Sequence, residues 1–300
     1  MKLDFDCIII GAGVAGMTSA IYLKRAGINV AIFEKSFLGG QINKTYSIKN
    51  YPGFIEIDGP TLALSINNQL KELDIPIIYE TVINVIDNQD IKVIKTDNKE
   101  YHSKTLIIAT GRKERNLRLE GEQQLVGHGI SWCATCDGHF FKEKTVAVVG
   151  GGNTAMEDAL YLSNICKKVY LINRSETFRA DKILLEQVKN KSNIEIITNS
   201  VITTLISTEH LLSGIIINEK TKLDVVGLFI AIGSDPAIEF LADLNLKLEK
   251  KYILVDRNMQ TSLPGIYAVG DVVKKELYQI ITAASDGAVA ANSVKNLLNR

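Results

Sequence analysis

The sequence predicts an α/β fold built from two Rossmann-like domains. A glycine-rich turn joins an apolar strand to a helix near the start of the chain, and the same pattern returns 139 residues later. β-rich runs separated by polar turns follow each copy, which predicts a small antiparallel addition to each parallel sheet. These runs are 82–86 with 91–96, and 200–206 with 212–218.

The composition is compatible with two domains. A chain of 300 residues with 46% hydrophobic content can bury two sizeable cores, at the usual ~100 to 200 residues per domain. The net charge is zero, so nothing indicates a nucleic acid or an anionic membrane as partner, because either normally requires a basic face. No apolar run reaches the ~18 residues that cross a bilayer, and Asp4 and Asp6 do not suit a secretory peptide. We therefore expect a cytoplasmic protein.

The first unit contains every element of a nucleotide-binding βαβ motif. An apolar strand at 5–10 leads into a turn at 11–16, a helix runs to about residue 26, and a strand at 28–33 follows. In such a turn, a side chain at the first glycine would block the bend, and one at the second would hold the backbone away from a pyrophosphate. The third position must be small so that helix and strand can pack, and the diphosphate lies on the free N–H groups of the helix. The three positions are Gly11, Gly13 and Gly16.

The second unit repeats this motif in the middle of the chain. A strand at 145–149 precedes the turn, a helix runs to about Cys166, and a second strand covers 168–172. The three small positions of the turn are Gly150, Gly152 and Ala155. A complete strand, turn, helix and strand makes each match far more specific than a glycine pattern alone.

The end of the second strand distinguishes the two units. Eighteen residues after the third glycine of the first turn stands Glu34, whose carboxylate can accept hydrogen bonds from a ribose 2′-hydroxyl of FAD or NAD. The same count in the second unit reaches Asn173, followed by Arg174 and Arg179. The carboxylate is absent there and cations are available for a 2′-phosphate, which favours NADP over NAD. The alternative is that these arginines only belong to a solvated loop.

A cysteine pair precedes the second turn. Cys133 and Cys136 are three residues apart and Asp137 follows them. A structural zinc site usually needs four ligands, and the remaining cysteines, Cys7 and Cys166, lie in apolar contexts typical of a core. A redox pair needs close thiols, one of low pKa, and a nearby proton donor or acceptor, which Asp137 can be. We therefore expect a redox-active dithiol and no metal, with an inert dithiol as the alternative.

Further segments accompany the string Cys133-Ala134-Thr135-Cys136-Asp137-Gly138. They are Gly39-Gly40-Gln41, Asn50-Tyr51-Pro52-Gly53, Thr105 to Gly111, and Gly265 to Asp271. Together with both turns, in this order, they resemble the low-molecular-weight bacterial thioredoxin reductases, which are flavin disulfide reductases. The resemblance extends from about Asp6 to Ala291.

The resemblance implies FAD and NADPH as cofactors, a thioredoxin or thioredoxin-like protein disulfide as partner, and a homodimer. Cys133 matches the cysteine that attacks the thioredoxin disulfide, Cys136 the one that faces the flavin, and Asp137 the acid/base residue. The implied cycle runs from NADPH to FAD, to the cysteine disulfide, and then to the partner. The matching FAD positions are Gly11, Gly13, Gly16, Glu34, Gln41, Asn50, Asp271 and Gln279, and the NADPH positions are Gly150, Gly152, Ala155, Arg174 and Arg179.

Two departures from the family pattern keep other electron donors open. The NADPH loop of the family typically reads His-Arg-Arg with a later Arg, whereas this chain has Asn173-Arg174-Ser175 with Arg179. The family's C-terminal Arg-Gln-Ala is Tyr278-Gln279-Ile280 here. NADH or ferredoxin therefore remains an alternative donor, although the intact Gly150 turn argues against ferredoxin. A flavin redox sensor without turnover, or a reductase for another thiol protein, are further alternatives.

The resemblance also predicts the domain organisation. Residues 1–115 and 238–300 are expected to form a discontinuous FAD-binding domain, because the Gly270-Asp271 segment belongs with the flavin. Residues 116–237 are expected to form an inserted NADPH-binding domain that carries the CxxC motif. The thiols must reach the flavin and then leave it to meet a bulky protein disulfide. We expect the two crossings, at 112–116 and 233–237, to act as a hinge.

Overall fold

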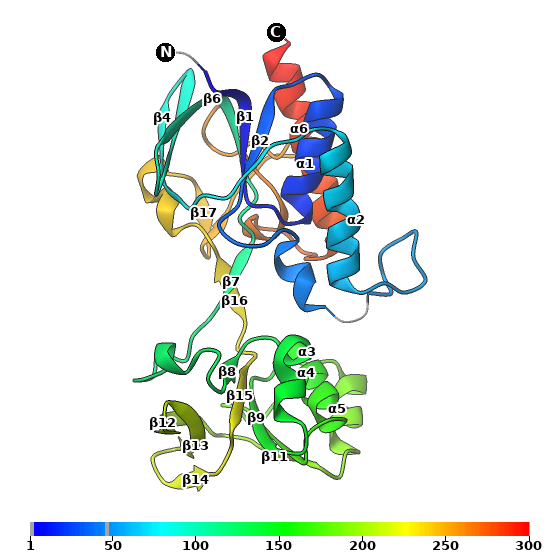
Figure 1. Cartoon of the computed structure of the whole chain (residues 1–300), viewed down its shortest axis with the longest axis vertical. Helices are drawn as coiled ribbons and strands as arrows, with labels where there is room; N and C mark the ends of the chain where they lie inside the picture. Colours follow the sequence, from blue (N-terminus) through cyan, green and yellow to red (C-terminus); the bar gives the residue numbers. More distant parts are fainter. Residues whose placement is uncertain (1–2, 46–47, 300) are drawn as a thin grey trace. The chain divides into compact units, whose positions relative to one another are not determined.

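The structure is a computed structural model that describes residues 3–45 and 48–299. The chain divides into two compact units, which are described here one at a time (Figure 1). Unit 1 comprises Met1–Lys113 and Asp235–Arg300, and unit 2 comprises Glu114–Ser234. Among the described residues, no helix is long and apolar enough to cross a membrane.

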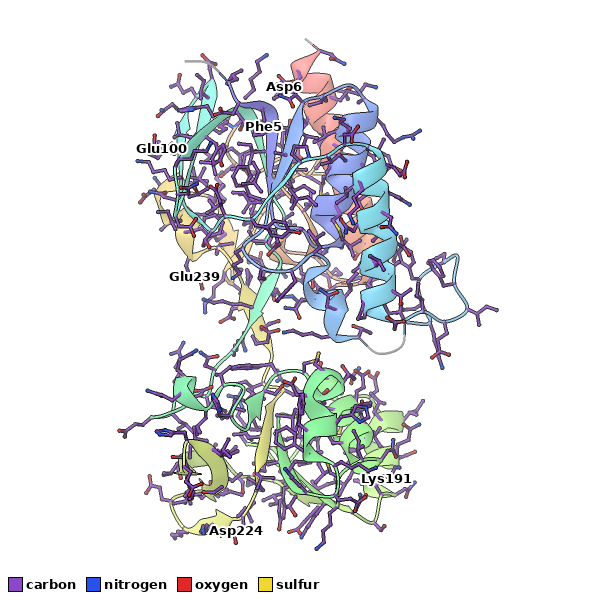
Figure 2. The ribbon with its side chains drawn as sticks, viewed as in Figure 1. Phe5, Asp6, Glu100, Lys191, Asp224 and Glu239 are labelled. Carbon is purple, nitrogen blue, oxygen red and sulfur yellow. A yellow bond between two sulfur atoms is a disulfide. The ribbon has the colours of Figure 1, made fainter. Side chains whose placement is uncertain are left out.

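Unit 1 is built on a seven-stranded sheet with the order β3-β2-β1-β6-β5-β4, in which β19 also pairs with β6. Strands β1, β2, β3, β6 and β19 are parallel, and Ile10 is in register with both Phe33 and Ile108. The carboxyl ends of these strands therefore meet at one edge. Figure 2 labels Phe5 and Glu100, the first residues of β1 and β6. The strands are β1 (Phe5–Ile10), β2 (Val30–Phe33), β3 (Ile77–Ile78), β4 (Val82–Asn88), β5 (Ile91–Thr96), β6 (Glu100–Ile108) and β19 (Ile266–Ala268).

Strand β1 is buried on both faces, as its continuous apolar run predicts. Cys7 and Ile9 point into a core that is shared with the helices, whereas Ile8 and Ile10 point into a second core on the opposite face. Figure 1 shows α1, α2 and α6 together on one side of this sheet. The helices are α1 (Val14–Arg25), α2 (Gly59–Glu72) and α6 (Ile280–Leu298).

Unit 2 contains a parallel five-stranded sheet with the order β11-β10-β9-β15-β8. Strands β9 and β10 cover the predicted residues, but α4 ends at Ser163, three residues before the predicted limit. Cys166 lies in the turn that follows, where its N–H donates to Leu162 O at 2.8 Å. The elements are β8 (Ile130–Ser131), α3 (Ala134–Asp137), β9 (Thr145–Val149), α4 (Asn153–Ser163), β10 (Lys168–Ile172), α5 (Lys182–Lys189), β11 (Ile194–Ile197) and β15 (Gly227–Ile230).

The predicted antiparallel additions are confirmed, but they attach differently in the two units. In unit 1, β4 and β5 form a hairpin that continues the main sheet through the first half of β6. In unit 2, β12 (Ile202–Thr208), β13 (Leu211–Ile217) and β14 (Thr221–Leu223) form a separate three-stranded sheet. Two further short strands, β7 (Arg112–Glu114) and β16 (Ser234–Pro236), pair where the chain crosses between the units.

Candidate active site

The first turn, residues 11–16, has the geometry of a diphosphate cradle. Gly11 has a φ of +105°, and a Cβ there would lie 2.4 Å from the carbonyl oxygen of Ala109. A Cβ on Gly16 would lie 2.0 Å from Gly11 O, whereas one on Gly13 would meet nothing within 4 Å. Gly13 therefore borders open space at the start of α1, where the absence of a side chain would let a ligand approach the backbone closely. Each of the three glycines is therefore required for a different physical reason: the first for the bend, the second for close approach to the backbone, and the third for packing.

Glu34 lies beside this turn at the end of β2. Its Oε2 accepts the N–H of Ala12 at 2.9 Å, and its Oε1 accepts the N–H of Ser36 at 2.9 Å. The carboxylate is thus held at the carboxyl edge of the sheet, next to the glycine turn. A cavity opens on this side, lined by Ser36, Phe37, Leu38, Asn43, Pro60 and Tyr79.

Most of the remaining predicted flavin residues form hydrogen-bonded pairs in unit 1. Gln41 donates through Nε2 to the carbonyl oxygen of Arg112 at 3.0 Å, and Arg112 pairs with Asp271 at 3.1 Å. Asn50 donates through Nδ2 to Oε1 of Gln279 at 3.0 Å. Five residues, each far in sequence from its partner, are therefore paired within unit 1.

Arg112 and Tyr278 were missed by the sequence analysis as a pair. The Arg112 guanidinium lies 4.2 Å from the centre of the Tyr278 ring, in cation–π geometry. Burial raises the pKa of the Tyr278 hydroxyl, so the ring stays neutral. In the sequence, Tyr278 is only a position where the family has an arginine and this chain does not. In the structure, Arg112, which is distant in sequence, places its positive charge at this position. No local pattern could have revealed this contact.

The residues of unit 1 fit a bound flavin nucleotide. Besides the open space at Gly13, the hydroxyl of Thr110 is buried and has no hydrogen-bond partner among the described residues. Thr110 follows β6 and lies against the first turn, since a Cβ on Gly11 would be 3.2 Å from its Cα. A buried hydroxyl without a partner is rare unless a ligand or water completes it.

The second turn, residues 150–155, reproduces the first. Gly150 has a φ of +154°, and a Cβ there would lie 2.2 Å from the carbonyl oxygen of Ala231. A Cβ on Gly152 would meet nothing within 4 Å, so this position again faces open space. Ala155 is fully buried at the third position, against the turn. The backbone of unit 2 is therefore also shaped to approach a diphosphate.

The predicted arginines lie in the loop that follows β10. Arg174 and Arg179 are both exposed, and neither forms an ion pair within residues 3–45 and 48–299. The N–H of Arg179 donates to the carbonyl oxygen of Gly151 at 2.7 Å, which places the loop beside the second turn. The backbone that carries Arg179 is therefore tied to the turn, and Arg174 lies at the start of the same loop.

Cys133 and Cys136 form a disulfide at the start of α3, with their Cα atoms 5.3 Å apart. The N–H of Cys136 donates to Cys133 Sγ at 3.1 Å, an arrangement that stabilises a thiolate on Cys133. Ser131 donates through Oγ to Asp137 Oδ2 at 2.6 Å and accepts the N–H of Cys133 at 3.0 Å. Ser131, which the sequence analysis did not identify, therefore connects Asp137 to the disulfide.

The two cysteines of the disulfide differ in accessibility. Cys133 is buried, with 8% of its surface exposed, whereas Cys136 is exposed. The other two cysteines are buried, and burial raises the pKa of Cys7 to about 12 and that of Cys166 to about 11. Both thiols are thus inert core residues, as predicted. Within the described part of the chain, no group of His, Cys, Asp and Glu side chains could hold a metal ion.

Helix α3 packs on the helix that begins at the second turn. Ala134 shares a buried cluster with Ala155 and Leu162 of α4, and a Cβ on Gly138 would touch Leu162 at 3.1 Å. The same helix carries Asp158, whose pKa is raised to about 7 by burial and, secondarily, by the charge of Glu157. One helix of unit 2, α4, therefore begins at the second turn and packs against α3, which carries the disulfide.

Comparisons with known proteins agree with this arrangement. Residues 5–287 match the pyridine nucleotide-disulphide oxidoreductase family. A thioredoxin reductase of Mycoplasma genitalium is 42% identical over 98% of this chain and 96% of its own. The crystal structure of Lactococcus lactis thioredoxin reductase in its FR conformation superposes with a TM-score of 0.91 at 37% identity, covering 99% of both chains. The crystal structure of T. acidophilum thioredoxin reductase gives a TM-score of 0.89 at 33% identity, covering 100% of both chains. The chain therefore belongs to the thioredoxin reductases, within the pyridine nucleotide-disulphide oxidoreductases, and its close Cys133–Cys136 pair is consistent with the redox-active dithiol of such an enzyme.

Proposed function

We propose that unit 1 binds FAD, that unit 2 binds NADPH, and that the Cys133–Cys136 pair passes two electrons to the disulfide of a thioredoxin. The observation that carries this proposal is the disulfide packed, through α3, on the helix that begins at the second glycine turn. A dithiol and a dinucleotide cradle on one helix suit an enzyme that links nucleotide oxidation to disulfide reduction. Membership of the family establishes a thioredoxin reductase. That this chain holds FAD and that it takes electrons from NADPH are our proposals.

In unit 1, the first turn would hold the diphosphate of FAD and Glu34 its adenosine ribose. Asp271, Gln41, Asn50 and Gln279 would line the remainder of the cofactor, with Arg112 fixed between two of them. When bound, the flavin supplies the exchange of two electrons between a nicotinamide and a disulfide. The protein contributes position, exclusion of water and proton management.

In unit 2, the second turn would hold the diphosphate of NADPH, and Arg174 and Arg179 its 2′-phosphate. A phosphate monoester carries close to two negative charges at neutral pH, and two guanidinium groups can match it with charge-assisted hydrogen bonds. Ser175 provides no third cation, so the loop has less positive charge than the family pattern. NADH is the second candidate on this ground.

The cysteines perform the exchange with the partner protein. Two electrons and two protons convert the Cys133–Cys136 disulfide into a dithiol. We assign the attack on the partner to Cys136, because it is the exposed residue of the pair and a bulky protein disulfide cannot reach a buried cysteine. The Cys136 thiolate forms a mixed disulfide and expels one partner thiolate, and Cys133 then attacks Cys136 Sγ and releases the second. The Cys133–Cys136 disulfide is restored and the partner leaves as a dithiol.

This assignment differs from the order that the resemblance implies, in which Cys133 attacks the partner. The Cys136 N–H still favours a thiolate on Cys133, which suits the resolving step. Asp137 would hold and move the proton at Oδ2, where Ser131 Oγ fixes the carboxylate at 2.6 Å. Two protons must pass to the partner thiols in each cycle, and Asp137 is the ionisable side chain directly adjoining the pair in sequence.

We further propose that the crossings between the units form a hinge. Unit boundaries fall at 113/114 and 234/235, and Gly111 and Gly233 adopt positive φ values of 63° and 96° close to them. Only a few residues in two crossings need to absorb a rotation that lets the dithiol alternate between flavin and partner.

The test is turnover by the FAD-loaded protein with NADPH and a thioredoxin disulfide. We expect FAD in a ratio close to one per chain and NADPH oxidation that depends on thioredoxin. In a separate trapping reaction with a thioredoxin that lacks its resolving cysteine, Cys133→Ser should form a mixed disulfide and Cys136→Ser should not. NADPH oxidation that is unaffected by thioredoxin would contradict the proposed activity, and an adduct formed only by Cys136→Ser would reverse the two cysteine roles.

A further inference from the structure

Asn173 is a buried polar side chain where unit 1 has a carboxylate. Only 5% of its surface is exposed, and it stands at the end of β10 as Glu34 stands at the end of β2. Its backbone is fully used, because its N–H donates to Ile197 O at 2.8 Å and its carbonyl accepts Ser200 N–H at 3.0 Å. These bonds therefore fix the backbone from which the side chain projects.

The side-chain amide of Asn173 is directed into the arginine loop. Nδ2 donates to the carbonyl oxygen of Ser175 at 2.8 Å and to that of Thr177 at 3.0 Å. Both amide hydrogens are used, so the group folds the loop back over the end of β10. A carboxylate at this position would set its negative oxygens against two carbonyl oxygens, which explains why an acidic residue does not fit here.

The opposite side of Asn173 touches the second turn. A Cβ on Gly151 would lie 2.5 Å from Asn173 Oδ1, so only glycine leaves room for this amide. The far end of the loop is tied to the same glycine, since Arg179 N–H donates to Gly151 O at 2.7 Å. Asn173 thus lies between the turn and the loop, and the loop is anchored at both ends.

None of these bonds uses an arginine side chain. The guanidinium groups of Arg174 and Arg179 stay exposed and without an ion pair among the described residues, while the backbone that carries them is fixed. Ordering a flexible loop on binding would cost conformational entropy, and a loop ordered in advance avoids that cost. This matters in a loop where only two cations are available and where Glu176, between them, carries the opposite charge.

We infer that Asn173 is the positioning residue that sets the preference of unit 2 for NADPH over NADH, by holding Arg174 and Arg179 ready for the 2′-phosphate. The inference rests on the proposed function, in which unit 2 binds NADPH. Asn173 acts through the loop and makes no contact with the reacting atoms. Its loss should therefore change discrimination between nucleotides and leave the chemical step intact.

The chain offers a matched control. Asn193 also donates two side-chain hydrogen bonds to carbonyl oxygens in unit 2, to Ser163 at 2.8 Å and to Cys166 at 3.3 Å. It precedes β11 and contacts neither the second turn nor the arginine loop through these bonds. Asn193→Ala therefore removes the same chemistry from the same unit at a different place.

The experiment compares Asn173→Ala, Asn173→Ser and Asn193→Ala with the unchanged, FAD-loaded full-length chain. For Asn173→Ala we expect the KM for NADPH to rise about tenfold, the loss typical of weakened charge-assisted bonds, with kcat and the KM for NADH within about twofold. Asn173→Ser keeps one hydroxyl donor, so its KM for NADPH should lie between those of the unchanged chain and Asn173→Ala. This variant still tests the inference if the alanine variant folds poorly. Asn193→Ala should leave the ratio of the two KM values unchanged.

Two readouts are independent of turnover. Binding of 2′,5′-ADP should weaken in Asn173→Ala by a similar factor, whereas binding of 5′-AMP should not change. Trypsin, which cleaves after arginine, should cut the 174–179 segment several-fold faster in Asn173→Ala without nucleotide, because the loop opens more often. Unchanged 2′,5′-ADP affinity and unchanged cleavage in the Asn173 variants would overturn the inference. An unchanged chain that fails to distinguish 2′,5′-ADP from 5′-AMP would instead contradict the NADPH assignment itself.

Discussion

The two glycine turns have nearly the same backbone and opposite chemistry beyond it. A Cβ added to Gly11 or Gly150 would lie within 2.5 Å of a carbonyl oxygen at the end of a neighbouring strand. Gly13 and Gly152 both face open space. At the end of the second strand, however, Glu34 accepts backbone N–H groups, whereas Asn173 donates to carbonyl oxygens. In our proposal, the turn provides a general place for a diphosphate, and the side chain after the second strand sets which nucleotide each unit recognises.

The sharpest difference between the units is the disulfide, which unit 2 carries near its turn. Replacing either partner, by Cys133→Ser or Cys136→Ser, should lower thioredoxin reduction by about a thousandfold or more, because the residues of a catalytic unit act together. FAD content should remain as in the unchanged protein. Steady-state assays and flavin absorbance measure the two properties. Cys166→Ser is the control, since this thiol is buried and should leave the rate unchanged. Full activity in either Cys133→Ser or Cys136→Ser would refute the scheme.

The two glycine turns can be disrupted separately, one unit at a time. Gly11→Val and Gly150→Val each force a side chain against backbone, at 2.4 Å and 2.2 Å. We expect Gly11→Val to lose FAD with at least a hundredfold weaker binding, as for a diphosphate site whose turn is disrupted, and Gly150→Val to keep FAD but lose NADPH binding. Flavin content and nucleotide titration measure both. Gly121→Ala, which also replaces a positive-φ glycine but in open space, is the control. Loss of FAD from Gly150→Val alone would invert our assignment of the units.

The charge difference between the units predicts a smaller effect. Arg174→Ala and Arg179→Ala should each raise the KM for NADPH about tenfold and leave that for NADH unchanged, because each removes one charge-assisted contact to a phosphate. The ratio of the two KM values is the measurement. Lys189→Ala removes an exposed charge from α5 and should not alter this ratio. If neither arginine affects the ratio, the loop is only a solvated surface.

Unit 1 also contains an arginine near its proposed cofactor site, Arg112, which contacts Asp271 and Tyr278. Arg112→Ala removes the ion pair with Asp271 and the contact with Tyr278, and we expect FAD to dissociate a few-fold faster, since partly exposed pairs contribute modestly. Arg112→Lys keeps the charge but not the planar stacking, and should fall between. Lys113→Ala is the neighbouring control. FAD release, followed by fluorescence, that is identical in all three variants would remove Arg112 from the flavin site.

The smallest effect concerns Asp158 on α4, where burial and then the charge of Glu157 raise the carboxyl pKa to about 7. The folded protein thus holds a proton that the unfolded chain has released between about pH 4 and 7, so this group lowers stability as pH rises through that range. Asp158→Asn should raise Tm by about 3 °C at pH 8, and the gain should shrink towards pH 5. Glu186→Gln, on the exposed side of α5, should show no such trend. A gain that is constant with pH would contradict the role of charge.

The sequence alone was sufficient to predict the parallel sheets, because apolar runs and glycine spacings are local signals. The predicted limits of β9 and β10 are the observed ones, and the first hairpin spans the predicted 82–96. The second hairpin spans 202–217, within two residues of the predicted 200–218. The helix end at Ser163 was missed because Ile165 and Cys166 continue the apolar pattern although the backbone turns there. Arg112 with Tyr278, and Ser131 with Asp137, were missed because these contacts depend on how the chain folds back. The two hydrogen bonds of the Asn173 amide were also beyond prediction, since a sequence does not show where a side chain points.

The most direct test of the account is an anaerobic stopped-flow titration of the FAD-loaded protein with NADPH and, separately, with NADH, following the flavin absorbance. The account predicts rapid bleaching by NADPH at concentrations where NADH acts much more slowly, because Arg174 and Arg179 have a phosphate to bind only in NADPH. Faster bleaching by NADH, or none by either nucleotide, would contradict the assignment of unit 2.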